Sequence, residues 1–196
     1  MIIKDLHLIQ YGEALAQMQA FTENRNADTP DELWLCEHPP VFTLGRHADA
    51  KHILNAYDIP IEHTDRGGQV TYHGPGQLMV YCLFDLRRKK KGIAEFVCDL
   101  EAKIINVLKE FGINATCEKG RPGVYVDHAK ICSIGLRVKH GFTYHGLALN
   151  INMDLKPFSD INPCGYENLA VTQMADFVAD VTVWQVKAAL VHVLSD

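Results

Sequence analysis

Two side chains in this sequence, Cys164 and Lys130, combine a reactive group with an unusual context. Cys164 stands in the polar, turn-rich segment 160–166, where Pro163 and Gly165 restrict the backbone beside the thiol. A thiol with an ordinary pKa of about 8.5 is only a few per cent thiolate at neutral pH, and a nearby ammonium group increases that fraction. Because loops on a rigid scaffold often hold functional groups, Cys164 is the candidate nucleophile among the six cysteines.

Three other cysteines are predicted to act as small buried hydrophobic side chains. Cys82 lies in an apolar run, Cys98 on a predicted core helix, and Cys132 on an apolar strand face. The sequence contains no Cys-x-x-Cys and no His-Glu-x-x-His pair, so it gives little support for a zinc site, and no metal is expected.

Lys130 begins a predicted strand over 130–138. Strict alternation would place Lys130, Cys132, Ile134, Leu136 and Val138 on one face. A lysine among apolar side chains is partly buried, and burial lowers the pKa of its amine, which is useful in catalysis. The alternative is a solvated lysine at the start of the strand. The sequence alone leaves open whether Lys130 and Cys164 meet.

The densest cluster of unusual residues is the glycine-rich segment 66–77. Its glycines let the backbone approach a ligand closely and adopt positive φ angles. It is not a Walker loop, because no Gly-Lys-Ser/Thr follows, and its glycine spacing differs from the dinucleotide fingerprint. Two tight turns around a strand are the alternative interpretation, but Arg66, Tyr72 and His73 beside the glycines favour a ligand-binding loop.

Helices and strands must position these residues. Apolar residues at helical spacing predict three helices, over 11–21, 93–111 and 183–194, the last with Thr182 as its N-cap. Apolar or β-branched runs predict extended chain over 32–42, 77–84, 123–126, 130–138 and 142–151. This order favours one α/β domain over 1–196, with a mixed β-sheet flanked by helices.

Length, composition and charge restrict the class of protein. The 196 residues are 47% hydrophobic and 22% charged, which is ordinary for a folded domain. A net charge of −5 argues against nucleic acid as the main partner. No apolar stretch approaches the ~20 residues that span a membrane, and the first residues lack a signal-peptide pattern, so a cytoplasmic location is expected.

Three segments, 66–77, 120–137 and 144–165, resemble the octanoyltransferases of lipoate biosynthesis, the lipoate-protein ligase B family. The likeness extends from about Trp34 to Thr172, and the motifs agree in order. This family moves an octanoyl group from acyl carrier protein to a lysine of lipoyl-dependent enzymes. The resemblance implies a fold like that of the biotin and lipoate protein ligases.

The resemblance also assigns roles to individual residues. Cys164, in Pro-Cys-Gly, matches the nucleophile, and Lys130, in Ala-Lys-Ile-Cys-Ser-Ile-Gly, matches the catalytic lysine. The implied acyl-binding residues are Arg66, Gly67, Gly68, Gln69, Val70, Thr71, Tyr72, His73, Ser133, Ile134, Gly135, Gly146, Leu147 and Ala148. Backbone N–H groups near Gly165, or in the loop of Gly67 and Gly68, are candidate donors to an oxyanion.

The partners follow from the same resemblance. Octanoyl-acyl carrier protein is the expected donor and delivers the acyl group on its phosphopantetheine arm, so no further cofactor is expected. The expected acceptors are the lipoyl domains of 2-oxoacid dehydrogenases and the glycine cleavage H protein. Because such partners are usually acidic, the basic run 87–91 is a candidate docking patch, with a solvated loop as the alternative.

Three other functions stay open. An ATP-dependent lipoate or biotin ligase of the same fold would have a glycine-rich loop and a lysine, but it would not need Cys164. A non-enzymatic acyl-binding module would form no covalent adduct. A hydrolase would pair Cys164 with His73 or His145.

Overall fold

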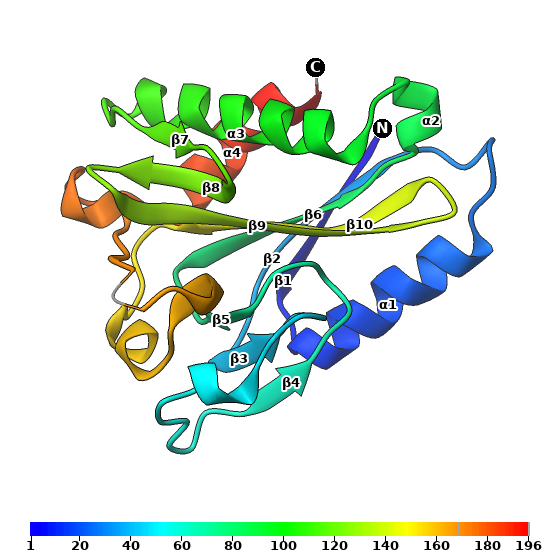
Figure 1. The fold of residues 1–196 in the computed structure, drawn as a ribbon. Coiled ribbons are helices and arrows are strands. Elements are labelled where there is room, and N and C mark those ends of the chain that lie inside the picture. The colour runs from blue at the N-terminus through cyan, green and yellow to red at the C-terminus, as the bar shows by residue number, and fades with distance from the viewer. Residues whose placement is uncertain (168, 196) are drawn as a thin grey trace.

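The computed structural model describes residues 1–167 and 169–195, and within them the chain forms a seven-stranded and a three-stranded sheet (Figure 1). The strands of the larger sheet are β1 (Ile2–Leu8), β2 (Glu32–Glu37), β6 (Gln77–Leu83), β7 (Thr116–Glu118), β8 (Arg121–Val126), β9 (Ala129–Lys139) and β10 (Phe142–Asn150). Their spatial order is β1-β2-β6-β10-β9-β8-β7. β1 runs parallel to β2, and the other neighbours are antiparallel. This mixed sheet confirms the predicted fold class.

The smaller sheet and the helices lie on the two faces of the larger sheet (Figure 1). The smaller sheet has the order β4-β3-β5, with β3 (Val41–Leu44), β4 (Ile61–His63) and β5 (Val70–His73). The α-helices are α1 (Tyr11–Asn24), α2 (Leu86–Lys89), α3 (Ile93–Glu110) and α4 (Val183–Ser195). The 3-10 turns are η1 (Ala50–His52), η2 (Lys156–Asp160), η3 (Pro163–Gly165) and η4 (Met174–Asp176).

One face of the larger sheet, here called the helical face, packs against α3 and α4. Phe96, Leu100 and Ile104 repeat at helical spacing along α3 and are at most 4% exposed. Val186 and Leu190 of α4 are fully buried in the same cluster. Each such side chain contributes about 1.5–3 kcal/mol on burial, so this face holds most of the apolar core.

The opposite face, here called the site face, packs against α1 and the smaller sheet (Figure 1). Met18 of α1 and Trp34 and Tyr81 of the sheet form an apolar cluster. A further cluster, around Phe42 and Tyr72, lies in the smaller sheet. Several polar side chains are buried between these clusters, and they surround the candidate site.

Several elements differ from those predicted. The extended segment 32–42 divides between two sheets, because the chain turns at Pro39 and Pro40. The edge strand β1 was not predicted, and most of its side chains are exposed, so the segment lacks a buried apolar pattern. Cys82 and Cys132 are buried as predicted, but the prediction for Cys98 is wrong, because its side chain is exposed on α3. Among the described helices, none combines the length and hydropathy needed to cross a membrane.

Candidate active site

The backbone of Cys164 adopts a conformation that is uncommon for a residue with a side chain. Cys164 has φ 57° and ψ 17° inside η3, in the left-handed region, and Gly165 follows with φ 77°. The turn is tied to its surroundings by the amide of Asn162, which donates to the His52 carbonyl at 2.8 Å. Strain of this kind collects at functional sites, and here it leaves the thiol half-buried at a cavity.

Lys130 is held rigidly, with its amine 3.2 Å from the sulfur of Cys164. Its backbone N–H donates to the Ala170 carbonyl at 2.8 Å, and its carbonyl accepts from Thr172 at 3.0 Å. The predicted alternation fails at this residue: a bulge at Ile131 makes Lys130 oppose Tyr125 of β8, whereas Cys132 opposes Val124. Lys130 therefore does not continue the row of Cys132, and its side chain reaches Cys164.

The Lys130 amine is a buried cation. The residue is 4% exposed, and its amine lies 3.2 Å from the Pro122 carbonyl and 5.2 Å from the centre of the Tyr125 ring. Burial alone would lower the pKa of Lys130, but Cys164 and Tyr125 outweigh it and raise the pKa above its ordinary value. Of the two interpretations of Lys130, the buried lysine is confirmed and the solvated lysine is wrong, whereas the predicted lowering of the pKa is wrong for the resting site. Lys130 is thus an ammonium group at neutral pH, in contact with the thiol.

Two hollows meet at Cys164. The first is a narrow cavity of about 60 Å³, lined by Arg66, Gly67, Gly68, Gln69, Val70, Thr71, His73, Ser133, Ile134, Gly135, Gly146, Ala148 and Cys164. The second, of about 330 Å³, is lined by Gly67, Gly68, Gln69, Ile93, Val97, Arg121, Pro122, Lys130, Ile134, Gly135, Leu136, Cys164 and Tyr166. The sulfur therefore contacts one space between the two sheets and another beside the start of α3.

Of the candidate acyl-binding residues, two do not line the narrow cavity. Tyr72 packs against Phe42 and Phe158 in the smaller sheet, with ring centres 5.6 and 5.5 Å away. Leu147 belongs to the core of the helical face. Because side chains alternate along β5 and β10, the side chains of Tyr72 and Leu147 point to the opposite face from their neighbours that line the cavity. Neither side chain therefore lines the cavity.

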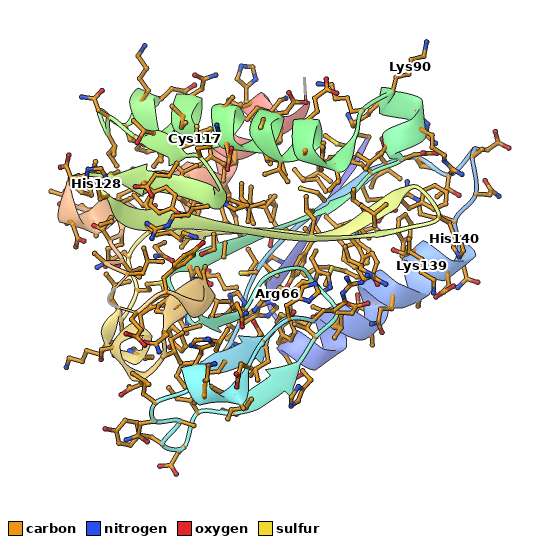
Figure 2. All side chains as sticks on the ribbon, viewed as in Figure 1. Arg66, Lys90, Cys117, His128, Lys139 and His140 are labelled. Atoms are coloured by element: carbon orange, nitrogen blue, oxygen red, sulfur yellow. The ribbon has the colours of Figure 1, made fainter. Side chains whose placement is uncertain are left out.

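Arg66 holds the glycine-rich loop in place between the two sheets (Figure 2). Its guanidinium donates to the Gly67 carbonyl at 3.0 Å and to the carbonyl and hydroxyl of Thr43, both at 2.8 Å. Burial lowers the pKa of Arg66, and it forms no ion pair with a carboxylate among the described residues. This buried cation places positive charge at the cavity that Cys164 adjoins.

The candidate oxyanion donors differ in availability. The Gly165 amide already donates to the Asn162 carbonyl at 2.9 Å, and the Gly67 amide donates to the Leu136 carbonyl at 3.0 Å. Among the described residues, the Gly68 amide has no acceptor, and Gly68 lines both hollows beside Cys164. Gly68 therefore stays a candidate donor, whereas Gly165 and Gly67 are engaged elsewhere.

His73 belongs to a chain of buried hydrogen bonds. The side-chain amide nitrogen of Gln77 donates to Asn150 at 2.9 Å, so its oxygen accepts from Nδ1 of His73 at 2.7 Å. Nε2 of His73 then accepts from the hydroxyl of Thr43 at 3.2 Å, and that hydroxyl accepts from Arg66. Burial holds the pKa of His73 well below its usual value. Both ring nitrogens are therefore occupied, and His73 positions the loop rather than exchanging protons with Cys164.

His145 anchors the same loop from β10. Its Nε2 donates to Asp65 at 2.8 Å, and the hydroxyl of Tyr144 donates to the same carboxylate. Burial lowers the pKa of His145, although Asp65 partly opposes that effect. Among the described residues, neither His145 nor His73 is bonded to Cys164, which removes the support for a cysteine–histidine hydrolase.

Sequence reasoning missed three contributors to the site, Thr43, Asp65 and Tyr125. Asp65 directly precedes Arg66, and this adjacency was the available signal for a loop anchor. Thr43 and Tyr125 lie in strands far from the glycine-rich segment in the chain. Only the strand registers bring Thr43 opposite Thr71 and Tyr125 opposite Lys130.

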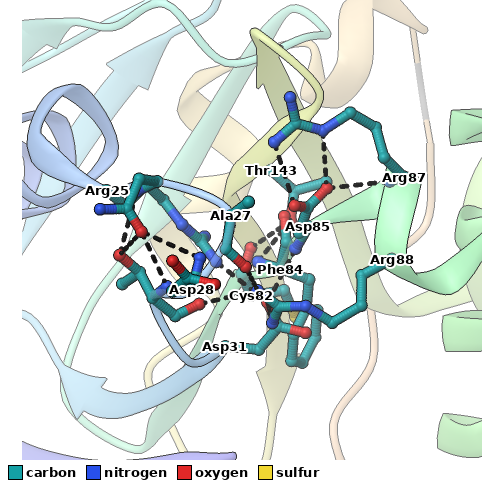
Figure 3. A network of polar contacts seen from close by, with 12 residues as sticks. Arg25, Ala27, Asp28, Asp31, Cys82, Phe84, Asp85, Arg87, Arg88 and Thr143 are labelled. Atoms are coloured by element: carbon teal, nitrogen blue, oxygen red, sulfur yellow. Dashed lines mark hydrogen bonds and ion pairs between the residues drawn. The ribbon is translucent and has the colours of Figure 1, made fainter.

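The basic run 87–91 is largely paired within the molecule, and Figure 3 shows the contacts of Arg87 and Arg88. Arg87 donates to Asp85 at 3.0 Å, and Arg88 contacts Asp31 at 3.1 Å, where Arg25 also binds. Lys91 forms an ion pair with Asp99. Three of the five charges therefore stabilise local structure, which weakens the interpretation of this run as a docking patch.

In the part of the chain that the structure describes, no three His, Cys, Asp or Glu side chains gather closely enough to hold a metal ion. The site combines a thiol, a buried ammonium group and an adjoining cavity. A nearby ammonium group increases the thiolate fraction of a thiol, and a thiolate is the reactive form in nucleophilic catalysis by cysteine.

Comparisons with known proteins identify the family. Residues 10–195 match the model of the lipoyl protein ligase A/B catalytic domain, and the chain therefore belongs to this family. Within it, the chain is 56% identical to an octanoyltransferase of Chromobacterium violaceum, covering 93% of this chain and 88% of the relative. It is 52% identical to an octanoyltransferase of Thiobacillus denitrificans, covering 99% and 89%. The chain is thus an acyltransferase of the octanoyltransferase group.

Solved structures with much lower identity share the fold. A lipoate-protein ligase A bound with ATP has a TM-score of 0.83 at 18% identity, covering 99% of this chain and 83% of that one. A bipartite lipoate protein ligase from Thermoplasma acidophilum has a TM-score of 0.81 at 18% identity, covering 99% and 82%. A biotin protein ligase from Aquifex aeolicus has a TM-score of 0.61 at 11% identity, covering 99% and 68%. These likenesses confirm the expected ligase-like fold.

Proposed function

We propose that this enzyme transfers an octanoyl group from octanoyl-acyl carrier protein to a lysine of lipoyl domains through a thioester on Cys164. The single observation that supports this mechanism most strongly is the 3.2 Å contact between the amine of Lys130 and the sulfur of Cys164 at the glycine-lined cavity. The octanoyltransferase relatives support the acyl group and the reaction class.

Before the first step, the Cys164 thiol releases its proton to solvent, and the Lys130 ammonium stabilises the resulting thiolate as an ion pair. In the first step, this thiolate attacks the thioester carbonyl on the phosphopantetheine arm. The oxyanion that forms is stabilised by the Gly68 amide, a contribution of about 3–4 kcal/mol for one such donor. The intermediate then expels the pantetheine thiolate, which takes a proton from the ammonium of Lys130. The products are octanoyl-Cys164, a neutral Lys130 amine and the free carrier thiol.

In the second step, the acceptor lysine attacks octanoyl-Cys164 and forms the amide. Acylation removes the thiolate beside Lys130, so the contribution of Cys164 to the raised pKa of Lys130 is lost, while the contribution of Tyr125 and the opposing effect of burial remain. Lys130 can then accept the proton released by the attacking amine. Collapse of the intermediate expels the Cys164 thiolate and restores the starting ion pair, so protons and charge balance over the cycle.

The proposed partners are octanoyl-acyl carrier protein as donor, and the lipoyl domains of 2-oxoacid dehydrogenases and the glycine cleavage H protein as acceptors. The reaction uses no nucleotide or other cofactor, because a thioester donor is already activated. An ATP-dependent ligase has the same fold, but it would need free octanoate and ATP.

A transfer assay separates these functions. The purified enzyme is incubated with a lipoyl domain and either octanoyl-carrier protein without ATP, or octanoate with ATP, and the mass of the domain is measured. We expect octanoylation in the first mixture and none in the second. Cys164→Ala should lower the rate at least ~1000-fold, since loss of a covalent nucleophile removes the main route. Transfer only in the ATP mixture would contradict the proposal.

A further inference from the structure

Strand registers place four small residues side by side under the narrow cavity. Ser133 and Gly135 of β9 lie opposite Ala148 and Gly146 of β10, and all four line the cavity. They form a flat floor, here called the small-residue floor, with little side chain above the sheet. Such a surface lets an unbranched chain lie across the two strands.

The next strand, β6, changes abruptly to large side chains. Met79 lies opposite Ala148, and Tyr81 lies opposite Gly146. Both belong with Ala148 to the apolar cluster under α1, and they are 5% and 1% exposed. The Tyr81 hydroxyl is fixed at 2.6 Å from Nε2 of His38. Met79 and Tyr81 thus form a wall where the small-residue floor ends.

The glycine-rich loop closes the cavity from the other side. Arg66 of this loop lies between the two sheets (Figure 2). A Cβ on Gly135 would meet the Gly67 carbonyl at 3.2 Å and Cδ of Arg66 at 3.3 Å, so roof and floor are close together. Cys164 lines this narrow cavity together with the small-residue floor, and the Met79–Tyr81 wall adjoins the floor on β6 without lining the cavity itself. The path from Cys164 along the floor to this wall is here called the slot.

The distance across the three strands β9, β10 and β6 matches the length of an acyl chain of about eight carbons. Neighbouring strands lie ~4.8 Å apart, so the path from β9 across β10 to β6 covers about two spacings, or ~10 Å. An extended eight-carbon chain has about that length. Building on the proposed function, we propose that Met79 and Tyr81 contact the terminal methyl group and set the chain length that Cys164 accepts. Met79 is the specificity-determining residue best suited to a test, because Tyr81 is also bonded to His38.

Two substitutions change the slot in opposite directions. Met79→Ala lengthens it, and Ala148→Leu shortens it by placing a bulky side chain on the floor. Gly146 is unsuitable, because a Cβ there would meet the Val80 carbonyl at 1.9 Å. Leu78→Ala is the matched control, since Leu78 is a buried neighbour on β6 that belongs to the helical-face core.

The experiment supplies the full-length enzyme with an equimolar mixture of six-, eight-, ten- and twelve-carbon acyl-carrier proteins and measures the masses of acylated enzyme at early times. Each buried methylene changes binding several-fold, so Met79→Ala should raise the ten-to-eight-carbon ratio about tenfold. Ala148→Leu should favour six carbons by a similar factor. Leu78→Ala should keep the wild-type ratio.

Wild-type ratios in both Met79→Ala and Ala148→Leu, in variants that still unfold cooperatively and still become acylated, would overturn the chain-length proposal and leave the proposed function intact. If Met79→Ala fails to fold, Ala148→Leu decides the question alone. No acylation of the wild-type enzyme by any donor would instead overturn the proposed function, and the chain-length proposal with it.

Discussion

On the helical face of the seven-stranded sheet, the buried cluster consists of apolar side chains from α3, α4 and the strands. On the site face, the same strands bury polar groups: Gln77 of β6, Asn150 of β10 and Lys130 of β9 are at most 4% exposed. Alternation along a strand produces both environments from adjacent residues. The comparison indicates that apolar packing supplies stability on one face, while hydrogen bonds position groups for chemistry on the other.

Substitution of the reactive groups on the site face should lower the transfer activity of the enzyme with little change in its free energy of unfolding. Lys130→Met should reduce transfer roughly 100- to 10,000-fold, the usual range for loss of a general acid–base group. Lys130→Arg should separate the two steps, because a guanidinium can stabilise the thiolate but cannot accept a proton. Rapid-quench measurement of acyl-enzyme and amide should show that Lys130→Arg slows the second step more.

The control for Lys130 is Lys119→Met, because Lys119 is an exposed lysine on the β7–β8 turn. Its rate should stay within twofold of wild type. Equal slowing of both steps in Lys130→Arg would contradict the proposed change in the role of Lys130 after acylation.

The helical face should respond in the opposite way. Ile104→Ala removes a fully buried side chain of α3 and should lower the free energy of unfolding by about 2–5 kcal/mol. The transfer rate at low temperature should change little, because Ile104 lies in the helical-face core, away from both hollows. Urea unfolding followed by circular dichroism measures the free energy of unfolding. A large loss of transfer rate in the folded variant would contradict the separate roles of the two faces.

Acid should destabilise the site face first. Burial lowers the pKa of His38, His73 and His145 in the folded protein. Their unfolded pKa is about 6.5, so the unfolded chain binds protons more readily. The neutral forms therefore stabilise the fold fully above pH ~6.5, and this contribution is lost as the pH falls towards the lower folded values.

The melting temperature should consequently fall by several degrees between pH 7.5 and 5. The slope should be smaller in His73→Gln and unchanged in Ile104→Ala, because the second substitution removes no titrating group. Differential scanning calorimetry over this range provides the measurement. An identical slope in His73→Gln and wild type would show that His73 is not part of the effect.

The smallest effect is expected from substitutions in the basic run 87–91. Lys89 lies over the Phe84 ring at 4.8 Å, and Lys90 is exposed at φ 52°. The double substitution Lys89→Gln, Lys90→Gln should change transfer from carrier protein less than twofold at low salt, because both charges are exposed and screened. A tenfold rise in the KM for the carrier protein, with no rise when a free pantetheine thioester is the donor, would instead support docking of the carrier protein on this run.

Long periodic segments made much of this fold predictable. The apolar positions of α3, the glycines before β6 and the glycine after α3 are local signals, and the predicted mixed α/β class is confirmed. The strands β4 and β7, with three residues each, are too short to show periodicity. The bulge at Ile131 was also hidden, because it depends on the register between β8 and β9.

The candidate site was predictable in part for the same reason. The segments that line the cavity carry recognisable glycines, but the side-chain directions of Tyr72 and Leu147 depend on strand alternation. The distance between Lys130 and Cys164 depends on the strained turn at η3 and on the bridge from Lys130 to Val171. Such long-range geometry has no local sequence signal.

Intact-mass measurement of the enzyme after brief mixing with octanoyl-carrier protein, in the absence of any acceptor and of ATP, tests the covalent role of Cys164 most directly. We predict a mass increase of one octanoyl group on the wild-type protein, located by peptide mapping at Cys164 and absent from Cys164→Ala. An unmodified wild-type enzyme that still octanoylates a lipoyl domain, or an adduct on another residue, would contradict the account.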